Sequence, residues 1–425
     1  TGTLFSDTSA LLGNGISTFP DYPAEIRAPQ GTVAGVSGFQ VHFGAKRQLN
    51  PGDFCDVLIA MNPAALKANR KWLKPGATVI LDEDSITEEH LRKAGFATLD
   101  PIRELNLEDF NVVVPNITEM TKAALADSGL DNKAMVKCKN MFALGICFYL
   151  YNRPEDHAKR YLDSKFAKKN PAIAEANKRA IDAGYNYAAN THQFANTYTV
   201  ASGQMEKGTY RSISGNVATA WGLCAASEKS GLPLFCGSYP ITPATVILEE
   251  LAKRKDLGVK TVQAEDEIAG ICTAIGASFA GNFAVTTTSG PGLSLKSEAL
   301  GLAVMTELPL VVVDVQRGGP STGLPTKTEQ SDLQQALYGR NGESPVAVIA
   351  ASMPSDCFHY AFEAGRIAME HMTPVVLLSD GFIANGSEPW KIPSMKDYPT
   401  INPPIIDKTE DGGPFMPYAR NEKLA

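Results

Sequence analysis

The chain has 425 residues, of which 44% are hydrophobic and 20% charged, the composition of an ordinary soluble globular protein with room for two or three domains. Its formal net charge of -7 argues against a broad basic surface that binds nucleic acid, although it is compatible with a local basic pocket. Its apolar runs are far shorter than the roughly 20 residues that span a bilayer, so we predict no membrane association.

The seven cysteines are odd in number and form no C-x-x-C pair. This usage is typical of reduced thiols and predicts a cytoplasmic protein with neither a structural zinc nor an iron–sulfur cluster of its own, so no residue is assigned as a metal ligand. The first residues lack the features of a secretory signal, and without an initiator Met the sequence is expected to start inside a longer gene product. Because the cysteines are not expected to hold a metal or a cluster, any redox centre must come from a partner.

Residues 1–190 are predicted to form an α/β domain with a helical extension. The apolar runs at 56–62 and 76–84 are separated by a segment of helical pattern, which indicates parallel strands. From about 116 to 190, apolar residues recur at helical spacings. Residues 191–214 are polar with little periodicity and are predicted to be a linker between domains.

Residues 215–385 alternate six short apolar runs with helical patterns, which predicts a buried parallel sheet with right-handed crossovers. Ligands bind such sheets at the carboxyl ends of the strands. Four loops at those ends carry Gly or Pro beside Ser, Thr, Arg or a carboxylate: GSYPITP (237–243), AEDE (264–267), TSGPG (288–292) and QRGGPSTGLPTKTEQ (316–330). Their convergence on one edge predicts a ligand site. The proline-rich residues 386–425 are predicted to be a linker to a further domain not present in the sequence.

The first two loops each allow a structural and a functional interpretation. Pro240 and Pro243 either form a turn with Pro243 at the first position of a helix, or hold Thr242 in a fixed direction toward a ligand. The acids of AEDE either compensate a helix dipole, or place a carboxylate at the mouth of a buried helix where its protonation is tunable.

The other two loops are equally open. Gly290 and Gly292 form either a plain strand-to-helix turn or, with Ser289 and the first helical amides, a cradle for an anion. Lys296 is expected near the first turn of the following helix, a poor position for a cation unless an anionic ligand is close. Arg317 is either a solvated loop residue or a bidentate partner for a carboxylate.

No P-loop, nucleophile elbow, zinc-protease or complete dinucleotide motif occurs, so any chemistry at this site must come from a bound cofactor.

Taken in order, the four loops resemble the α subunit of the 2-oxoacid:ferredoxin oxidoreductases, most closely the 2-oxoglutarate (KorA-type) branch. The resemblance covers about 215–390 and rests on YPITP, a glutamate-led helix with a glycine nine residues after Glu267, TSGPGLSL and QRGGPSTGLPTKTEQSDL. YPAEIRAPQG, DVLIAMNPAAL and GATVILDED resemble the γ subunit of the same family, which implies a fused γ-α chain.

The family resemblance implies a thiamine diphosphate enzyme. Residues 215–385 would be its pyrimidine-binding domain, while a separate β subunit would hold the diphosphate, Mg2+ and an iron–sulfur cluster, in a dimer of αβ pairs. This agrees with SDGFIANG, which has only the D-G of the G-D-G motif that binds the diphosphate and metal. The implied reaction, a step of the TCA cycle, converts 2-oxoglutarate and coenzyme A reversibly to succinyl-CoA and CO2 and passes electrons to ferredoxin.

Three residues match the family's catalytic positions. Glu267 matches the carboxylate that hydrogen-bonds the aminopyrimidine ring nitrogen and so promotes loss of the thiazolium C2 proton, and its spacing to Gly276 favours it over Glu265. Thr242 matches the threonine that faces the keto or carboxylate oxygens of the substrate, and Arg317 matches the arginine that binds the 2-oxo carboxylate.

The resemblance also implies contacts around these three residues. Lys296 and Lys327 are expected to meet the second carboxylate of 2-oxoglutarate, or coenzyme A. The residues expected to bind the cofactor are Tyr239, Pro240, Ile241, Glu267, Ser289 and Gly290.

Two alternatives stay open: the same chemistry on pyruvate or on branched or aryl 2-oxoacids, and a scaffold subunit that binds no thiamine. The sequence also departs from the family pattern at both ends. The strand and Gly-rich turn that open the γ domain are missing before Thr1, and the α/β domain that follows the proline-rich tail is missing too.

Overall fold

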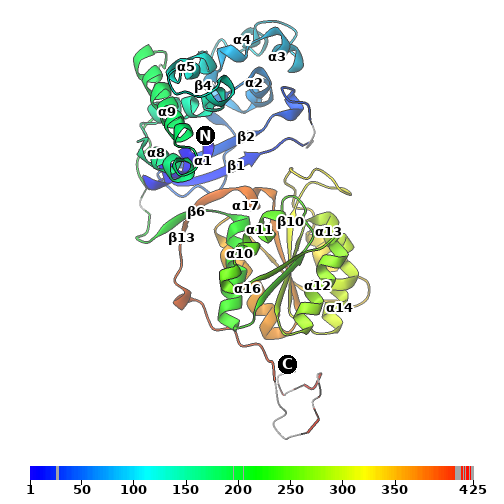
Figure 1. Ribbon diagram of the computed structural model, residues 1–425. Helices are drawn as coiled ribbons and strands as arrows, with labels where there is room; N and C mark the ends of the chain where they lie inside the picture. Colours follow the sequence, from blue (N-terminus) through cyan, green and yellow to red (C-terminus); the bar gives the residue numbers. More distant parts are fainter. Residues whose placement is uncertain are drawn as a thin grey trace. The chain divides into compact units, whose positions relative to one another are not determined.

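The computed structural model describes residues 1–24, 28–194, 196–203, 205–406, 413–414, 416, 418–420 and 422. Within YPAEIRAPQG, positions 25–27 lie outside the described residues, as do single positions of the predicted linker and most of the tail beyond 406. The chain divides into two compact units, Thr1–Lys207 and Gly208–Ala425, which Figure 1 shows in ribbon form. Among the described residues, no helix combines the length and the apolar character needed to cross a membrane.

The first unit contains a three-stranded parallel sheet in the order β3-β4-β5, formed by Cys55–Ala60, Leu73–Leu81 and Asn111–Val113. The apolar runs at 56–62 and 76–84 therefore form parallel strands, as their pattern predicts. Between them lies α2 (Pro63–Asn69), which begins where the side chain of Asn62 accepts a hydrogen bond from the amide of Ala65 (2.8 Å).

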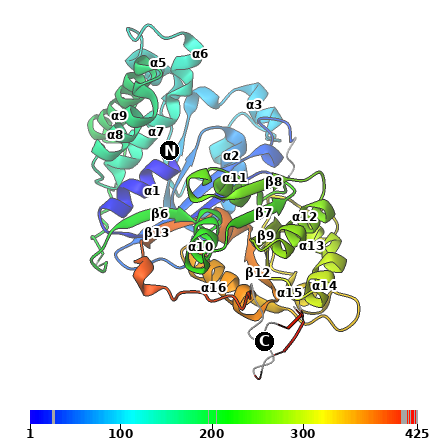
Figure 2. The same cartoon turned by 60° about the horizontal axis from the view of Figure 1, so that its bottom comes forward.

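Helices make up most of the rest of this unit, and Figure 2 shows α5 to α9 gathered together, with α3 apart from them. Their bounds are α1 Gly2–Leu11, α3 Glu88–Lys93, α4 Pro101–Glu104, α5 Ile117–Ala124, α6 Asn132–Lys137, α7 Lys139–Leu150, α8 Asp156–Leu162 and α9 Pro171–Thr191. Helices α7 and α9 approach closely through Gly145 and Gly184. A Cβ on Gly145 would lie 2.1 Å from the carbonyl oxygen of Ile181, and one on Gly184 would lie 1.9 Å from that of Phe142. The unit also has an antiparallel ribbon of β1 (Gly15–Asp21) and β2 (Gly38–Gly44), which the sequence pattern did not indicate.

The second unit is built on a six-stranded sheet in the order β11-β12-β10-β9-β7-β8, in which every pairing is parallel. This confirms the predicted fold class. The strands are β7 Leu234–Ser238, β8 Lys260–Gln263, β9 Phe283–Thr288, β10 Leu310–Gln316, β11 Ala347–Ala350 and β12 Pro374–Asp380. Strands β9, β10 and β12 are buried along their whole length, which explains why they read as continuous apolar runs.

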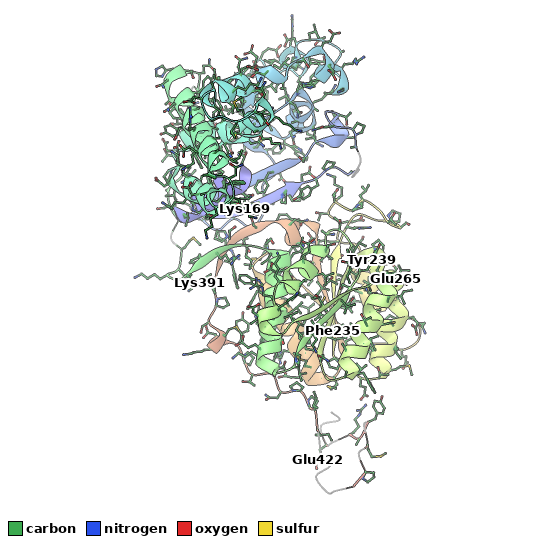
Figure 3. The ribbon with its side chains drawn as sticks, viewed as in Figure 1. Lys169, Phe235, Tyr239, Glu265, Lys391 and Glu422 are labelled. Carbon is green, nitrogen blue, oxygen red and sulfur yellow. The ribbon has the colours of Figure 1, made fainter. Side chains whose placement is uncertain are left out.

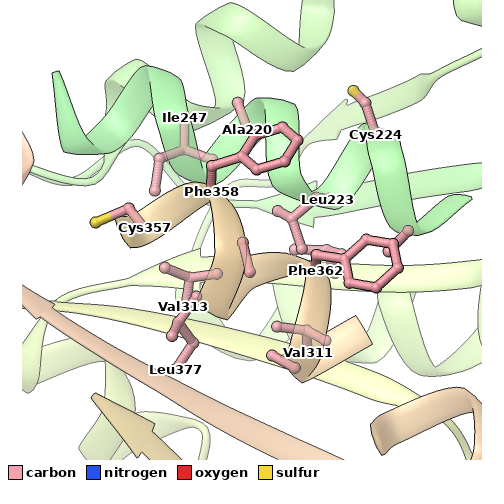
Figure 4. Close-up of a cluster of buried hydrophobic side chains, with 14 of the residues drawn as sticks. Ala220, Leu223, Cys224, Ile247, Val311, Val313, Cys357, Phe358, Phe362 and Leu377 are labelled. Atoms are coloured by element: carbon pink, nitrogen blue, oxygen red, sulfur yellow. The ribbon is translucent and has the colours of Figure 1, made fainter. Parts of the chain in front are cut away.

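Helices cover both faces of this sheet (Figure 1). On one face, α10 (Gly215–Ser230), α11 (Thr245–Ala252) and α16 (Asp356–His371) bury their apolar sides. Figure 4 shows Phe358 and Phe362 of α16 in this cluster with Val311 and Val313 of β10. The other face is covered by α12 (Glu267–Phe279), α13 (Gly290–Leu295) and α14 (Ser297–Met305). The remaining short helices are α15 (Leu333–Tyr338) and α17 (Gly381–Asn385).

Two predicted segments differ from the structure. The pattern over 293–306 predicts one helix, but α13 and α14 are separate and meet at Lys296. Part of the predicted linker is a strand, β6 (Tyr210–Ser214), which pairs antiparallel with β13 (Ser387–Lys391) in the predicted tail. These strands are anchored by buried residues, Ile213 in β6 and Trp390 in β13, and Trp390 packs against Phe358. The sequences of β6 and β13 are mostly polar, so the burial of Ile213 and Trp390 could not be predicted from them.

Candidate functional site

The four predicted loops lie at the carboxyl ends of neighbouring strands. Strand β7 pairs with both β8 and β9, and the amide of Ala264 donates to the carbonyl oxygen of Ser238 (2.9 Å). Figure 3 shows Tyr239 and Glu265 at one edge of the sheet, at the opposite end from Phe235. The structure therefore brings the loops after β7 and β8 together, as the parallel-sheet rule predicts.

The turn after β7 is fixed by side chains from two other elements. Arg317 Nη1 donates to the carbonyl oxygen of Thr242 (2.7 Å), and Asn216 Nδ2 of α10 donates to that of Pro243 (2.9 Å). The Thr242–Pro243 peptide is cis. Helix α11 begins only at Thr245, so the interpretation that Pro243 is the first residue of a helix is wrong. The turn is instead held by hydrogen bonds from Asn216 of α10 and from Arg317 at the end of β10.

Arg317 is a buried cation at the end of β10. It is 7% exposed, so it is not a solvated loop residue. Besides its bond to the 237–243 turn, its Nη2 donates to the carbonyl oxygen of Thr322 (2.7 Å), while its buried Nε has no hydrogen-bond partner among the described residues. Burial lowers the pKa of Arg317, and the Glu267 carboxylate opposes that shift. A buried guanidinium near a carboxylate, with N–H groups to spare, is suited to bind an anionic group.

Glu267 is the first residue of α12 and only 8% exposed, whereas Glu265 is exposed. Its position is set by Asp266, whose side chain caps the helix by accepting from the amide of Ala269 (2.7 Å). Its side chain touches the backbone of Gly292, where a Cβ would lie 2.7 Å from Glu267 Cγ. Within the described parts of the chain, its carboxylate accepts no hydrogen bond from protein. A largely buried carboxylate without a protein donor is a group that a ligand can satisfy.

Ser289 and Gly290 begin α13 beside this carboxylate. Ser289 is fully buried, and its hydroxyl has no hydrogen-bond partner in the part of the chain that the structure describes. Gly290 lies against Asp332, because a Cβ there would be 2.7 Å from Asp332 Oδ2. The side chain of Tyr239 is 37% exposed and Ile241 is half-buried, so both remain accessible at the same edge.

Lys296 lies elsewhere than the sequence analysis placed it. It lies between two helices, as the C-cap residue of α13 and the N-cap residue of α14, where its ammonium bonds to protein oxygens and so does not require an anionic ligand. The residue is fully buried, and its Nζ donates to the backbone oxygen of Glu267 (2.7 Å) and to Thr286 Oγ1 (3.1 Å). Burial lowers its pKa to about 8, against the opposing charge of Glu267. Lys327 is half-buried in the loop after β10, and its backbone oxygen accepts from the amide of Gly318 (2.7 Å).

The unpartnered polar groups fit the cofactor that the resemblance implies. Thiamine diphosphate presents an aminopyrimidine with hydrogen-bonding nitrogens, and the Glu267 carboxylate and Ser289 hydroxyl are groups that can bind such nitrogens. Within the described residues, no group of three or more His, Cys, Asp or Glu side chains is placed to hold a metal ion.

Sequence reasoning missed two parts of the site. One is Asn216, whose polar side chain in the first turn of a largely buried helix was the available signal. The other is the pair Asp314 and Asp332, in which Asp314 stands alone among apolar residues in LVVVDV. An acid within a buried strand is rare enough to have been singled out.

Family models match most of the chain. Residues 228–423 match the model described as "Pyruvate flavodoxin/ferredoxin oxidoreductase, thiamine diP-bdg", a thiamine diphosphate-binding region. Residues 1–187 match "Pyruvate ferredoxin/flavodoxin oxidoreductase".

Individual relatives agree with these models. The chain is 53% identical over 423 residues to the 2-oxoglutarate oxidoreductase subunit KorA of Mycobacterium tuberculosis, covering all of this chain and 64% of that one. It is 42% identical over 207 residues to the 2-oxoglutarate synthase subunit KorA of Methanothermobacter marburgensis, covering 48% of this chain and 53% of that one. The chain therefore spans less than two thirds of the length of these relatives.

A solved structure is also similar. It is the 2-oxoglutarate:ferredoxin oxidoreductase from Magnetococcus marinus with 2-oxoglutarate, coenzyme A and succinyl-CoA bound, at a TM-score of 0.81 and 34% identity. The match covers 99% of this chain and 67% of that one.

Proposed function

This chain belongs to the pyruvate and 2-oxoacid ferredoxin/flavodoxin oxidoreductase family, and from that premise we propose that it is the fused γ-α subunit of a 2-oxoglutarate:ferredoxin oxidoreductase. The reaction is the reversible, coenzyme A-dependent conversion of 2-oxoglutarate to succinyl-CoA and CO2, with electrons passed to ferredoxin. The observation that carries the proposal is the meeting of Arg317, Thr242 and the unpartnered Glu267 carboxylate at the carboxyl edge of a sheet with a thiamine diphosphate-binding family match. Residues 215–385 are proposed as the pyrimidine-binding domain, and residues 1–190 as the γ-type domain.

Glu267 is proposed to hold the pyrimidine ring of the cofactor. When bound, thiamine diphosphate supplies the carbon nucleophile and the electron sink that decarboxylation of a 2-oxoacid requires. With the cofactor bound, the Glu267 carboxylate would hydrogen-bond the ring nitrogen and could hold its proton, and the close contact with Gly292 would keep the side chain in place. Ser289 adds a hydroxyl, while the other residues proposed to line the ring come from the two adjoining loops: Tyr239, Pro240, Ile241 and Gly290.

Arg317 and Thr242 are proposed to bind the substrate's 2-oxo carboxylate. Two of the N–H groups of Arg317 hold backbone oxygens, which fixes the guanidinium plane, and the second N–H of each terminal nitrogen is left for the substrate. Lys327 is proposed for the second carboxylate or for coenzyme A. Lys296 is proposed as a positioning residue, because its buried ammonium is bonded to the backbone of Glu267 and is not free to reach a ligand.

A β subunit is proposed to supply the diphosphate site, Mg2+ and the iron–sulfur cluster, in a cytoplasmic dimer of αβ pairs. Exposed apolar side chains on α12, α13 and α14 support a protein partner on that side of the sheet: Ile268, Phe279, Leu295, Leu302 and Met305. All seven cysteines are free, in keeping with a reducing compartment and with a redox centre on another chain.

The test uses the complex purified with its β subunit. Glu267→Gln is expected to preserve assembly and to lower kcat at least 100-fold, whereas Glu265→Gln, the exposed neighbour, keeps nearly full activity. Full activity of Glu267→Gln would refute the assignment. Relative kcat/KM on 2-oxoglutarate, pyruvate, a branched and an aryl 2-oxoacid decides the substrate. Absence of thiamine from the purified complex would favour the scaffold alternative.

A further inference from the structure

Asp314 and Asp332 form a buried carboxyl pair at the base of the loop that carries Arg317. Asp314 is fully buried on the central strand β10, and Asp332 precedes α15. The two carboxyl groups interact, since each shifts the pKa of the other. Within the described residues, neither oxygen of the Asp314 carboxyl nor Oδ2 of Asp332 has a hydrogen-bond donor, as expected where two carboxylates, which only accept, face each other.

Among the residues that the structure describes, no cation neutralises this pair. The other charged groups on neighbouring elements are Glu329 in the same loop, Asp380 at the end of β12, and Lys296, whose ammonium bonds to Thr286 of the adjacent strand β9. Asp380 caps α17 and Lys296 bonds to other oxygens, and no ion pair to either carboxyl occurs in the described part of the chain. Burial raises the pKa of Asp314 well above its usual range, and the charge of Asp332 raises it further. Burial also raises the pKa of Asp332, and its interaction with Asp314 opposes that shift.

Two carboxylates in contact and out of water cannot both be charged at low cost, so they hold a proton between them. With that proton on Asp314, its O–H donates to the Asp332 carboxylate, and the pair is satisfied without any cation. Loss of the proton leaves two buried negative charges in contact. The cheapest relief is for Asp332 to move toward solvent, because Asp314 is fixed within a central strand.

Asp332 connects the two loops proposed to bind the substrate and the cofactor. Its backbone amide donates to Gln316 Oε1 (3.0 Å), which ties the end of the loop back to the strand where it began at Arg317. Its carboxyl lies against Gly290, next to the unpartnered hydroxyl of Ser289. Movement of Asp332 therefore shifts both the base of the 317–332 loop and the start of α13.

We propose that Asp314 and Asp332 are positioning residues, whose shared proton closes the base of the 317–332 loop and thereby sets the placement of Arg317 for the substrate carboxylate. This inference rests on the function proposed above. Neither residue contacts a reacting atom. The pair makes substrate binding depend on pH through a group outside the reaction itself.

The test compares wild type with Asp314→Asn in the purified complex. The asparagine amide donates to the Asp332 carboxylate at every pH, so the pair stays closed without a titratable proton. Glu249→Gln removes the same formal charge at an exposed position of the same unit and serves as the control. Three quantities are measured between pH 6 and 9.5: the melting temperature, the rate of tryptic cleavage after Lys327, and the KM and kcat for 2-oxoglutarate.

An acid whose pKa is raised by folding contributes stability that is lost as pH rises from its ordinary value toward the raised one. Wild type and Glu249→Gln are therefore expected to lose stability with rising pH, to be cut faster after Lys327, and to show a KM that rises at least fivefold while kcat changes little. Asp314→Asn is expected to show none of these changes beyond the shared background. If the melting temperature and the cleavage rate change with pH in the same way in wild type and in Asp314→Asn, the proposal that the two carboxyls share a proton is refuted.

If Asp314→Asn alters melting and cleavage but leaves the KM profile as in wild type, the positioning role is overturned. Melting and cleavage need no turnover. A complex that turns over no 2-oxoacid but shows the expected difference in both therefore contradicts the proposed function while it supports a proton-closed loop.

Discussion

Replacing Gly292 with alanine tests whether its close contact with Glu267 shapes the cofactor site. A Cβ at this position would lie 1.9 Å from Thr288 Oγ1 and 2.7 Å from Glu267 Cγ. Both neighbours are buried, so the methyl group cannot be accommodated unless the Glu267 side chain or the start of α13 moves. Overpacking of this kind costs about 1–3 kcal/mol. Alanine's helical preference over glycine returns about 1 kcal/mol, which leaves a net loss of about 0–2 kcal/mol.

The matched control is Gly276→Ala. Gly276 lies in α12, is exposed, and a Cβ there would meet no atom within 4 Å outside its own helix. The same chemical change should therefore stabilise the protein by about 0.5–1 kcal/mol. Urea unfolding of the purified complex measures both variants, and thiamine content measures the site. Gly292→Ala is expected to be less stable and to lose thiamine, in contrast to the control. Equal stability and equal thiamine content in both variants would refute the claim that the contact matters.

Two further predictions concern the cations of the site. Arg317→Lys is expected to raise KM for 2-oxoglutarate at least tenfold, because an ammonium cannot bridge the carbonyl oxygens of Thr242 and Thr322 while binding a carboxylate; an unchanged KM would exclude that role. Lys296→Met is expected to change the pH dependence of stability: burial lowers the folded pKa of Lys296 from its ordinary 10.5 to about 8, so Lys296 adds a contribution to stability that rises with pH across that window. Between pH 7 and 10.5 the melting temperature of the variant should therefore have a lower slope against pH than that of wild type, and parallel curves would contradict it.

The sheet of the second unit was predictable because its inner strands β9, β10 and β12 are buried along their whole length. Runs such as LVVVDV are then almost continuously apolar and stand out from the helices between them. The division of one predicted helix at Lys296 was not predictable, because the apolar pattern continues across this residue. The break coincides with a contact to a residue that is distant in the sequence. There the ammonium reaches the backbone of Glu267, far away in the sequence.

The placement of the site followed from strand order, since parallel strands deliver their following loops to one edge. Its internal contacts did not follow. The bond from Arg317 to the backbone of Thr242 depends on the register of β7, β9 and β10, and no local pattern encodes that register. Burial of Asp314 depends on β10 being central in the sheet, which requires the whole strand order.

The antiparallel pairing of β6 with β13 has a consequence for how such chains are assembled in evolution. These strands are the first and last of the second unit, with Tyr210 at the start of β6 opposite Lys391 at the end of β13, and the chain then continues along the unit to the buried Ile401. A unit whose ends lie side by side can be joined to other sequences, or inserted between them, without disturbing its interior. The pairing therefore brings the first and last strands of this unit together, an arrangement compatible with its position behind the proposed γ-type unit in a single chain.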